Sequence, residues 1–223
     1  MLETLIPNWG RFGDRLISDT MATLQMVAIA GSIAFILGMT FGVLLVVTKK
    51  EGILEQLFIY NLLDMIINVI RSIPFLILLI LLIPISRAIV GTGLGVTGAI
   101  IPLVFGTTPF FARQIESAIA ELDSGLVEAS LAMGMSPIEI IFSVYLRESI
   151  PSITRVTQIT AINLVALTTF AGAVGAGGLG DFAIQFGLQL RLMDLLWAAI
   201  IIILIIVSVI QGIGNVIIKW STK

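Results

Sequence analysis

The first candidates for chemistry in this sequence are three polar residues in a long apolar run. Asp64, Asn68 and Arg71 are spaced i, i+4, i+7, which places them on one face of a helix. A charge at the middle of a bilayer costs about 2.5–3.5 kcal/mol on insertion scales, so exposure of Arg71 to lipid is disfavoured. We expect either a polar face on a solute pathway or dimer seam, or an internal Asp64–Arg71 clamp. A position of Asp64 at the cytoplasmic interface is a further alternative.

The residue types that most often act as acid–base catalysts or metal ligands are missing. The sequence has no histidine and no cysteine, which removes the commonest general base, the commonest metal ligand and all thiolate chemistry. No lysine is followed by Ser or Thr, so a Walker A loop is absent. We therefore expect no enzyme activity, cofactor or metal site in this chain, and an intramembrane enzyme is disfavoured. Transport driven by ATP requires a partner that hydrolyses it.

The composition is typical of an integral membrane protein. Hydrophobic residues make up 58% of the chain and charged residues 12%, compared with about 25% charged residues in soluble domains. The net charge of −2 argues against nucleic acid as a partner. The N-terminus lacks a basic segment followed by an apolar one, so we expect no cleaved signal peptide.

Five apolar segments are long enough to cross a bilayer as helices, for which about 20 apolar residues are needed. The long continuous runs predict an all-α membrane protein rather than an outer-membrane barrel. Pro74 predicts a kink in the second segment, and glycines before Val96 predict a loop ahead of the third. We expect one transmembrane domain over residues 1–223, with spans near 20–48, 53–83, 96–112, 153–172 and 195–218.

The distribution of Lys and Arg predicts the orientation of these spans. Five spans place the termini on opposite sides. If the N-terminus is outside, seven basic residues lie on the inner side and four on the outer side, which favours this orientation and a cytoplasmic C-terminus. The inner residues are Lys49, Lys50, Arg113, Arg147, Arg155, Lys219 and Lys223, and the outer ones are Arg11, Arg15, Arg87 and Arg191.

The same orientation places the polar segment 122–150 in the cytoplasm. Asp123 or Ser124 can begin a first helix, and Gly134 suits the position after its end, where a positive φ is needed. The run Ser136-Pro137-Ile138-Glu139 predicts a capping box that begins a second helix, which extends to about Glu148. Physics alone leaves two interpretations open. The segment is either a connector in the lipid headgroups or a docking surface for a soluble partner.

Residues in this segment resemble a known motif. Glu128-Ala129-Ser130, followed after three residues by Gly134, is similar to the EAA loop of permease subunits of bacterial ABC importers. Arg147 stands where that family usually has proline. The wider pattern resembles methionine-importer permeases, with four blocks in the family's order: "IRSIPFLILL", "PFFARQIE", "GLVEASLAMGMSP" and "GAVGAGGLG".

The resemblance implies a type I importer permease with five transmembrane helices and cytoplasmic coupling helices over 124–148. It implies a homodimer in the bacterial cell membrane. Two cytoplasmic ATPase subunits would bind ATP and Mg, and an extracytoplasmic substrate-binding lipoprotein would deliver methionine. A permease for another amino acid or an osmoprotectant, and a channel or ion-coupled carrier without an ATPase, are the alternatives. The residues implied in ATPase coupling are Glu128, Ala129, Ser130, Gly134 and Met135.

The glycine-rich stretch "TTFAGAVGAGGLG", residues 168–180, is the other informative segment. In a membrane protein such a stretch allows either a tight approach of backbones or a helix broken at a cavity. Phe170 is the last bulky residue before it. We interpret Phe170 as a candidate gate, in which two copies meet on a dimer axis. The alternative is an ordinary core or lipid-facing aromatic residue.

Overall fold

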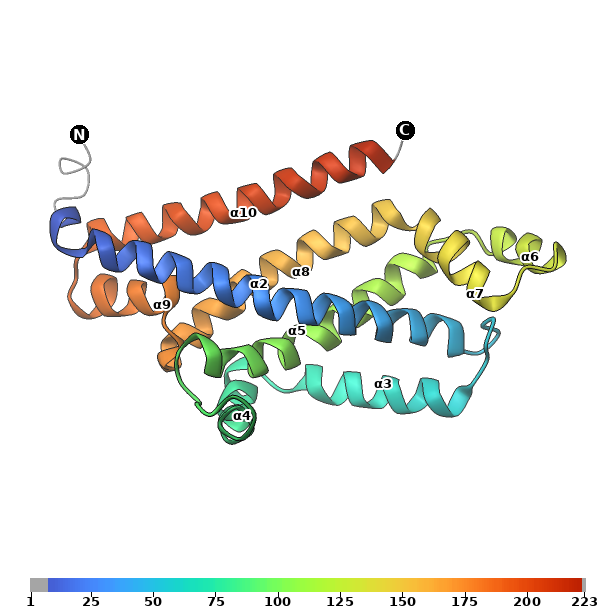
Figure 1. Cartoon of the computed structure of the whole chain (residues 1–223), viewed down its shortest axis with the longest axis horizontal. Helices are drawn as coiled ribbons and strands as arrows, with labels where there is room; N and C mark the ends of the chain where they lie inside the picture. Colours follow the sequence, from blue (N-terminus) through green and yellow to red (C-terminus); the bar gives the residue numbers. More distant parts are fainter. Residues whose placement is uncertain (1–7, 222–223) are drawn as a thin grey trace. The chain divides into compact units, whose positions relative to one another are not determined.

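The structure, a computed structural model, describes residues 8–221. The remaining residues, 1–7 and 222–223, include Lys223 of the charge comparison and the beginning of the N-terminal stretch in which no signal peptide is expected. Helices account for the regular structure of the described part (Figure 1). They are α2 (Trp9–Thr48), α3 (Leu57–Ser72), α4 (Phe75–Val90), α5 (Gly95–Ala120), α6 (Ser124–Ala132), α7 (Pro137–Ile140), η1 (Ile141–Leu146), α8 (Ile150–Ala171), η2 (Gly172–Ala176), α9 (Gly178–Phe182), η3 (Ala183–Gln189) and α10 (Met193–Ser221).

Within residues 8–221, four helical segments are long and apolar enough to cross a membrane: α2, α5, α8 with η2, and α10. A fifth crossing exists if α3 and α4, which are bent by 107° at their junction, count as one span. This bend is where the structure differs most from the expected span 53–83. Pro74 has φ −54° and ψ 132°, because a residue without an N–H group cannot continue the helix of α3.

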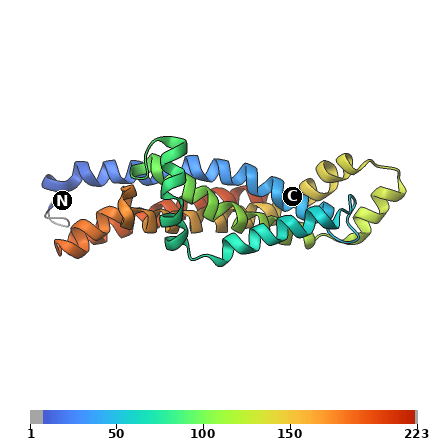
Figure 2. The same ribbon diagram turned by 90° about the horizontal axis from the view of Figure 1, so that it is seen from below.

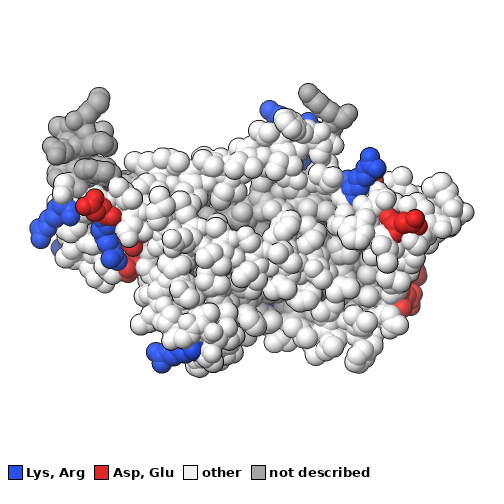
Figure 3. Space-filling model, in the orientation of Figure 1, with Lys and Arg blue, Asp and Glu red and all other residues white. Residues whose placement is uncertain are grey.

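Two spans are longer than their apolar segments. α2 begins at Trp9, ahead of residue 20, and α5 ends at Ala120, beyond residue 112. Each extension contains a salt bridge between residues on one helix face, Arg15–Asp19 in α2 and Arg113–Glu116 in α5. Ion pairs between residues three or four apart stabilise a helix, and here they do so in the stretches that lie outside the apolar segments. On the face shown in Figure 3, charged side chains are few among a large uncharged surface.

The chain forms two compact units, and four long helices contribute residues to both. The first unit contains Ile73–Gly106, Ala161–Ile210 and the described part of Met1–Ile33. One of its hydrophobic cores is built around Leu103 and Leu164, and another around Leu179 and Phe182. These cores fix the glycine-rich stretch against α2, α5 and α10.

The second unit contains Ala34–Ser72, Thr107–Thr160 and the described part of Gln211–Lys223. Its main core joins residues of α2 and α5 to residues of α7 and η1, including Val46, Ile115, Ile140 and Tyr145. The segment expected to face the cytoplasm is therefore packed directly on the membrane helices.

Glycines in α2 permit a close approach to α5 within the second unit. A Cβ added to Gly42 would lie 2.6 Å from the Ile115 side chain and 2.7 Å from the Ala112 carbonyl oxygen. A Cβ on Gly38 would lie 2.7 Å from the Phe111 ring. Small residues of this kind allow the backbones of two membrane helices to pack closely.

Candidate functional site

The first helix of the polar segment, α6, begins at a side-chain cap. The carboxylate of Asp123 accepts a hydrogen bond from the Gly125 N–H group at 2.9 Å. This bond satisfies one of the amide donors that have no partner within the first turn of a helix. The prediction that Asp123 or Ser124 begins the helix is confirmed.

The end of α6 is a tight turn centred on Gly134. The N–H group of Met135 donates to the Ser130 carbonyl at 3.1 Å, and that of Gly134 donates to the Leu131 carbonyl at 3.0 Å. This pair of bonds defines a Schellman motif. Gly134 has φ +80°, which glycine adopts without steric cost. The predicted helix end at Gly134 is confirmed.

The second helix of the segment begins at the predicted capping box. Ser136 Oγ accepts from the Glu139 N–H group at 3.4 Å, and Glu139 Oε2 accepts from the Ser136 N–H group at 2.7 Å. The hydrogen bond from the Ser136 backbone, then that from its hydroxyl group, lowers the pKa of Glu139 below its ordinary value of 4.5. The carboxylate that closes the box is therefore present above pH 4.5 and is lost only as the pH falls through the lowered pKa.

The path of the chain after α7 departs from the expected regular helix to Glu148. The π-helix η1 (Ile141–Leu146) takes over, and a turn at Ser149 separates it from α8. Arg147, at the position where the resembling family has proline, is exposed and helical. Pro151 lies in the first turn of α8, where proline is tolerated because no helical partner is lost.

The resulting helix pair, α6 and α7 with η1, extends beyond the neighbouring ends of α5 and α8 (Figures 1 and 2). We call its outer side the coupling surface. Glu128, Ala129 and Gly134 are exposed there. Five large apolar side chains are also exposed on the helix pair: Leu126, Leu131, Met133, Ile138 and Phe142.

The other two predicted coupling residues point inward. Ser130 is buried and donates from Oγ to the Leu126 carbonyl at 2.7 Å. Met135 packs with Val127 against the core of the second unit. The structure therefore divides the predicted set into three exposed residues and two residues that anchor the segment.

The three polar residues of the second span do not form the clamp that was considered. Asp64 pairs with Arg113, which is on α5, and Asn68 accepts a hydrogen bond from the same guanidinium at 3.1 Å. Arg71 is exposed, and no ion pair in the described part of the chain contains it. The Asp64–Arg71 clamp is therefore wrong.

Sequence reasoning missed Arg113 because it was counted as a cytoplasmic loop charge. Its guanidinium also donates to Glu116 at 2.6 Å, one helical turn along α5. The i, i+3 spacing of Arg113 and Glu116 was visible in the sequence. The spacing to Asp64, 49 residues away, was not. These contacts make Arg113 the centre of a charged network between two helices of the second unit.

The glycine-rich stretch reverses the chain between α8 and α9. A Cβ on Gly172 would lie 2.5 Å from the Asp181 nitrogen, and one on Gly180 would lie 2.5 Å from the Thr169 carbonyl oxygen. The tight backbone approach that was expected is therefore present. Phe170 lies just before this turn, with 52% of its surface exposed.

A small pocket lies next to the same turn, and its enclosed part has room for about one water molecule. Apolar residues and glycines form its wall: Leu79, Ile83, Gly93, Gly95, Gly98, Ala99, Pro102, Ala171, Val174 and Ala176. Within residues 8–221, no group of three His, Cys, Asp or Glu side chains is placed to hold a metal ion.

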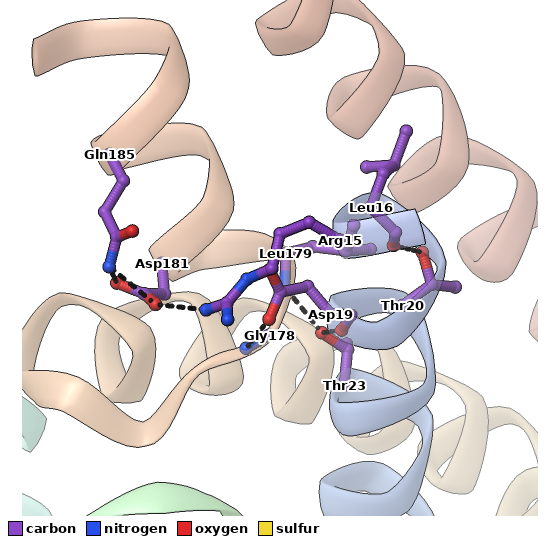
Figure 4. Close-up of polar contacts among 9 residues, drawn as sticks. All are labelled: Arg15, Leu16, Asp19, Thr20, Thr23, Gly178, Leu179, Asp181 and Gln185. Atoms are coloured by element: carbon purple, nitrogen blue, oxygen red, sulfur yellow. Dashed lines mark hydrogen bonds and ion pairs between the residues drawn. The ribbon is translucent and has the colours of Figure 1, made fainter. Parts of the chain in front are cut away.

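A second polar network, in the first unit, was not anticipated. Arg15 Nε donates to Asp19 Oδ2 at 2.7 Å, and its guanidinium also lies 3.5 Å from Asp181 of α9 (Figure 4). Asp181 in turn accepts from the Gln185 amide at 2.8 Å. Arg15 had been counted only as an outer charge, because the expected span began at residue 20. The polar start of α2 gave no sequence signal for a partner so far along the chain.

Comparison with known proteins agrees with this architecture. The sequence profile of one family, described as "Binding-protein-dependent transport system inner membrane component", matches residues 38–221. The chain is 44% identical over 206 residues to the probable D-methionine transport system permease protein MetI of Vibrio cholerae, with 92% of each chain covered. It is 43% identical over 197 residues to the corresponding protein of Pasteurella multocida, with 88% of this chain and 91% of that protein covered.

Solved structures agree as well. An inward-facing structure of the MetNI methionine ABC transporter matches with a TM-score of 0.88 and 40% identity, covering 91% of this chain and 94% of the other. An amino acid ABC transporter solved with histidines matches with a TM-score of 0.77 at 18% identity. The latter likeness shows the fold alone.

Proposed function

This chain belongs to the binding-protein-dependent transport system inner membrane components, and we propose that it is the permease subunit of an ATP-driven methionine importer. The observation that carries the proposal is 44% identity over 92% of the chain to a protein named as a D-methionine permease. The chain is a multi-pass membrane subunit and not an enzyme, and ATP hydrolysis belongs to a separate subunit.

The assembly that we propose has two copies of this chain and two cytoplasmic ATPase subunits that bind ATP and Mg. A substrate-binding lipoprotein outside the membrane delivers methionine to the pathway between the two copies. The N-terminus faces outward and the C-terminus faces the cytoplasm. The balance of basic residues supports this orientation, and the apolar surface of the long helices supports their contact with lipid.

The coupling surface is where we propose that the ATPase binds. Its exposed apolar side chains, with Glu128 at their side, suit a groove on another protein. The capping box and the turn at Gly134 make the segment stiff. Ile140 and Tyr145 share one core with parts of α2, α5 and α8. A push on the segment would therefore move these helix ends together.

ATP-driven uptake is the direct test of this function. We expect proteoliposomes that contain the chain, its ATPase and a methionine-loaded binding protein to accumulate methionine, and to hydrolyse ATP faster than without the binding protein. Vesicles without the ATPase are the control, and uptake by them would contradict the proposal. Preferential uptake of another amino acid or an osmoprotectant would still show an ATP-driven importer, but it would reject methionine as the solute.

Phe170 is the residue that we propose as the gate of this pathway. It is half exposed at the end of α8, beside the glycine-rich turn. We expect Phe170→Ala to raise passive methionine efflux from loaded vesicles several-fold in the absence of ATP. Phe58→Ala, which removes an exposed phenyl ring from α3, is the matched control. Uncoupled ATP hydrolysis with an unchanged leak would reject the gate.

A further inference from the structure

α9 begins without a cap of its own. The residue before it, Gly177, has φ +78° and ψ −163° and provides no side-chain hydrogen bond. Gly175 and Gly178 also have positive φ angles. Glycine has the widest range of allowed φ and ψ angles of any residue. The turn between α8 and α9 therefore needs restraints from outside itself.

Two side chains of α2 supply these restraints (Figure 4). Asp19 Oδ1 accepts a hydrogen bond from the Gly178 N–H group at 3.3 Å, and Thr23 Oγ1 accepts one from the Leu179 N–H group at 2.8 Å. These are the first two amides of α9, which have no carbonyl partner within the helix. A helix start that is normally capped by its own preceding residue is here capped from another helix.

The two capping side chains are buried. Asp19 is 4% exposed and Thr23 is 2% exposed. Arg15 neutralises the Asp19 carboxylate from one helical turn away and reaches Asp181 of α9 as well. Separation of α9 from α2 would leave the Gly178 and Leu179 amides without partners and would break the Arg15–Asp181 ion pair. Unsatisfied polar groups of this kind are costly in a bilayer.

The fit between the two elements is also tight. A Cβ on Gly178 would lie 2.7 Å from Thr23 Oγ1 and 2.9 Å from Met26 Cε. Leu179 and Phe182 are fully buried in one core with Leu16 of α2. Hydrogen bonds and packing therefore hold the same few residues. A partial separation of α9 from α2 would lose both at once and would be high in energy.

We propose that Asp19 and Thr23 are positioning residues for transport, which fasten the glycine-rich turn to α2 so that the two move as one body during the cycle. The inference rests on the proposed function. The turn also carries Phe170 at its α8 end, so the fastening sets where that side chain lies. If these contacts were lost, ATP hydrolysis would continue, but the glycine-rich turn would no longer move together with α2.

The test uses the assembled transporter with its ATPase and binding protein in proteoliposomes. Thr23→Val keeps the shape of the side chain and removes the acceptor for the Leu179 amide, whereas Thr23→Ser keeps the hydroxyl group. Thr20→Val is the matched control, because the Thr20 hydroxyl bonds to the Leu16 carbonyl of its own helix and to no residue of α9. Two quantities are measured: methionine imported per ATP hydrolysed, and deuterium exchange at the amides of residues 172–182.

We expect Thr23→Val to lower the imported methionine per ATP several-fold and to speed exchange at Leu179. Thr23→Ser and Thr20→Val should match the unaltered protein in both measurements. Asp19→Leu, which removes the acceptor for the Gly178 amide, should lower the imported methionine per ATP in the same way and speed exchange at Gly178, and it replaces Thr23→Val if that variant does not assemble.

A fall of uptake and hydrolysis in proportion would overturn the inference, because a merely structural role lowers the amount of active transporter and not its coupling. Unchanged exchange at Leu179 in Thr23→Val would overturn it as well. If the unaltered complex imports no methionine, the proposed function fails. The exchange measurement then still decides whether α2 fastens the turn.

Discussion

Glu128→Arg is expected to abolish ATP-driven methionine uptake while the chain still inserts and folds. Glu128 is exposed on α6, and no hydrogen bond or ion pair in the described part of the chain uses its carboxylate. Its replacement therefore costs the fold little. Where a basic group of the ATPase faces Glu128, the reversed charge places like charges together, which costs several kcal/mol of binding free energy.

The measurement is uptake of radiolabelled methionine in vesicles, together with the amount of ATPase that co-purifies with the chain. The matched control is Glu51→Arg, the same change at an exposed residue of the loop between α2 and α3 whose carboxylate accepts no hydrogen bond in the described part of the chain. We expect the control to transport normally and to retain the ATPase. Full uptake by Glu128→Arg would refute the coupling role of α6.

Loss of Arg113 is expected to have the largest effect on stability. Its guanidinium, with a side chain 19% exposed, neutralises both Asp64 and Glu116. Arg113→Met leaves two carboxylates without a counter-ion between membrane helices. Removal of one partner from a fully buried charge network typically costs about 3–5 kcal/mol. Because the side chains of this network are only partly buried, we expect a smaller loss, about 1–3 kcal/mol in the free energy of unfolding, measured in mixed micelles.

Two further variants test whether the loss of stability in Arg113→Met comes from unpaired charges. The triple variant Arg113→Met, Asp64→Leu, Glu116→Met replaces the network by apolar side chains and should regain most of the lost stability, because no unpaired charge remains. Arg71→Met removes an arginine that has no ion pair with any residue of 8–221 and should leave stability unchanged. It should lower uptake if the polar face of α3 lines the pathway. An Arg113→Met protein as stable as the unaltered chain would contradict the network.

Features that depend on neighbouring residues could be predicted from the sequence. The capping box needs only Ser136 and Glu139, and the turn at Gly134 needs only one residue without a side chain. Both are set by the local backbone. The resemblance of this segment to an EAA loop then connected local geometry to a partner.

Features that join distant parts of the chain could not be predicted in this way. The Asp19–Gly178 contact spans 159 residues. An aspartate at the polar start of a helix looks the same in sequence whether it faces water or caps another helix. The bend between α3 and α4 was foreseen at Pro74, but its angle depends on packing that a sequence of apolar residues does not specify.

The close approach of α2 and α5 has a consequence for how this sequence can vary in nature. Every residue that can replace glycine adds a Cβ, and at Gly42 that atom would meet both the Ile115 side chain and the Ala112 backbone. Any substitution of Gly42 is therefore expected to disturb the packing of α2 against α5. Gly212 of α10 can be substituted without a clash, because an added Cβ meets nothing within 4 Å. Among natural variants we expect Gly42 to be retained and Gly212 to be replaced.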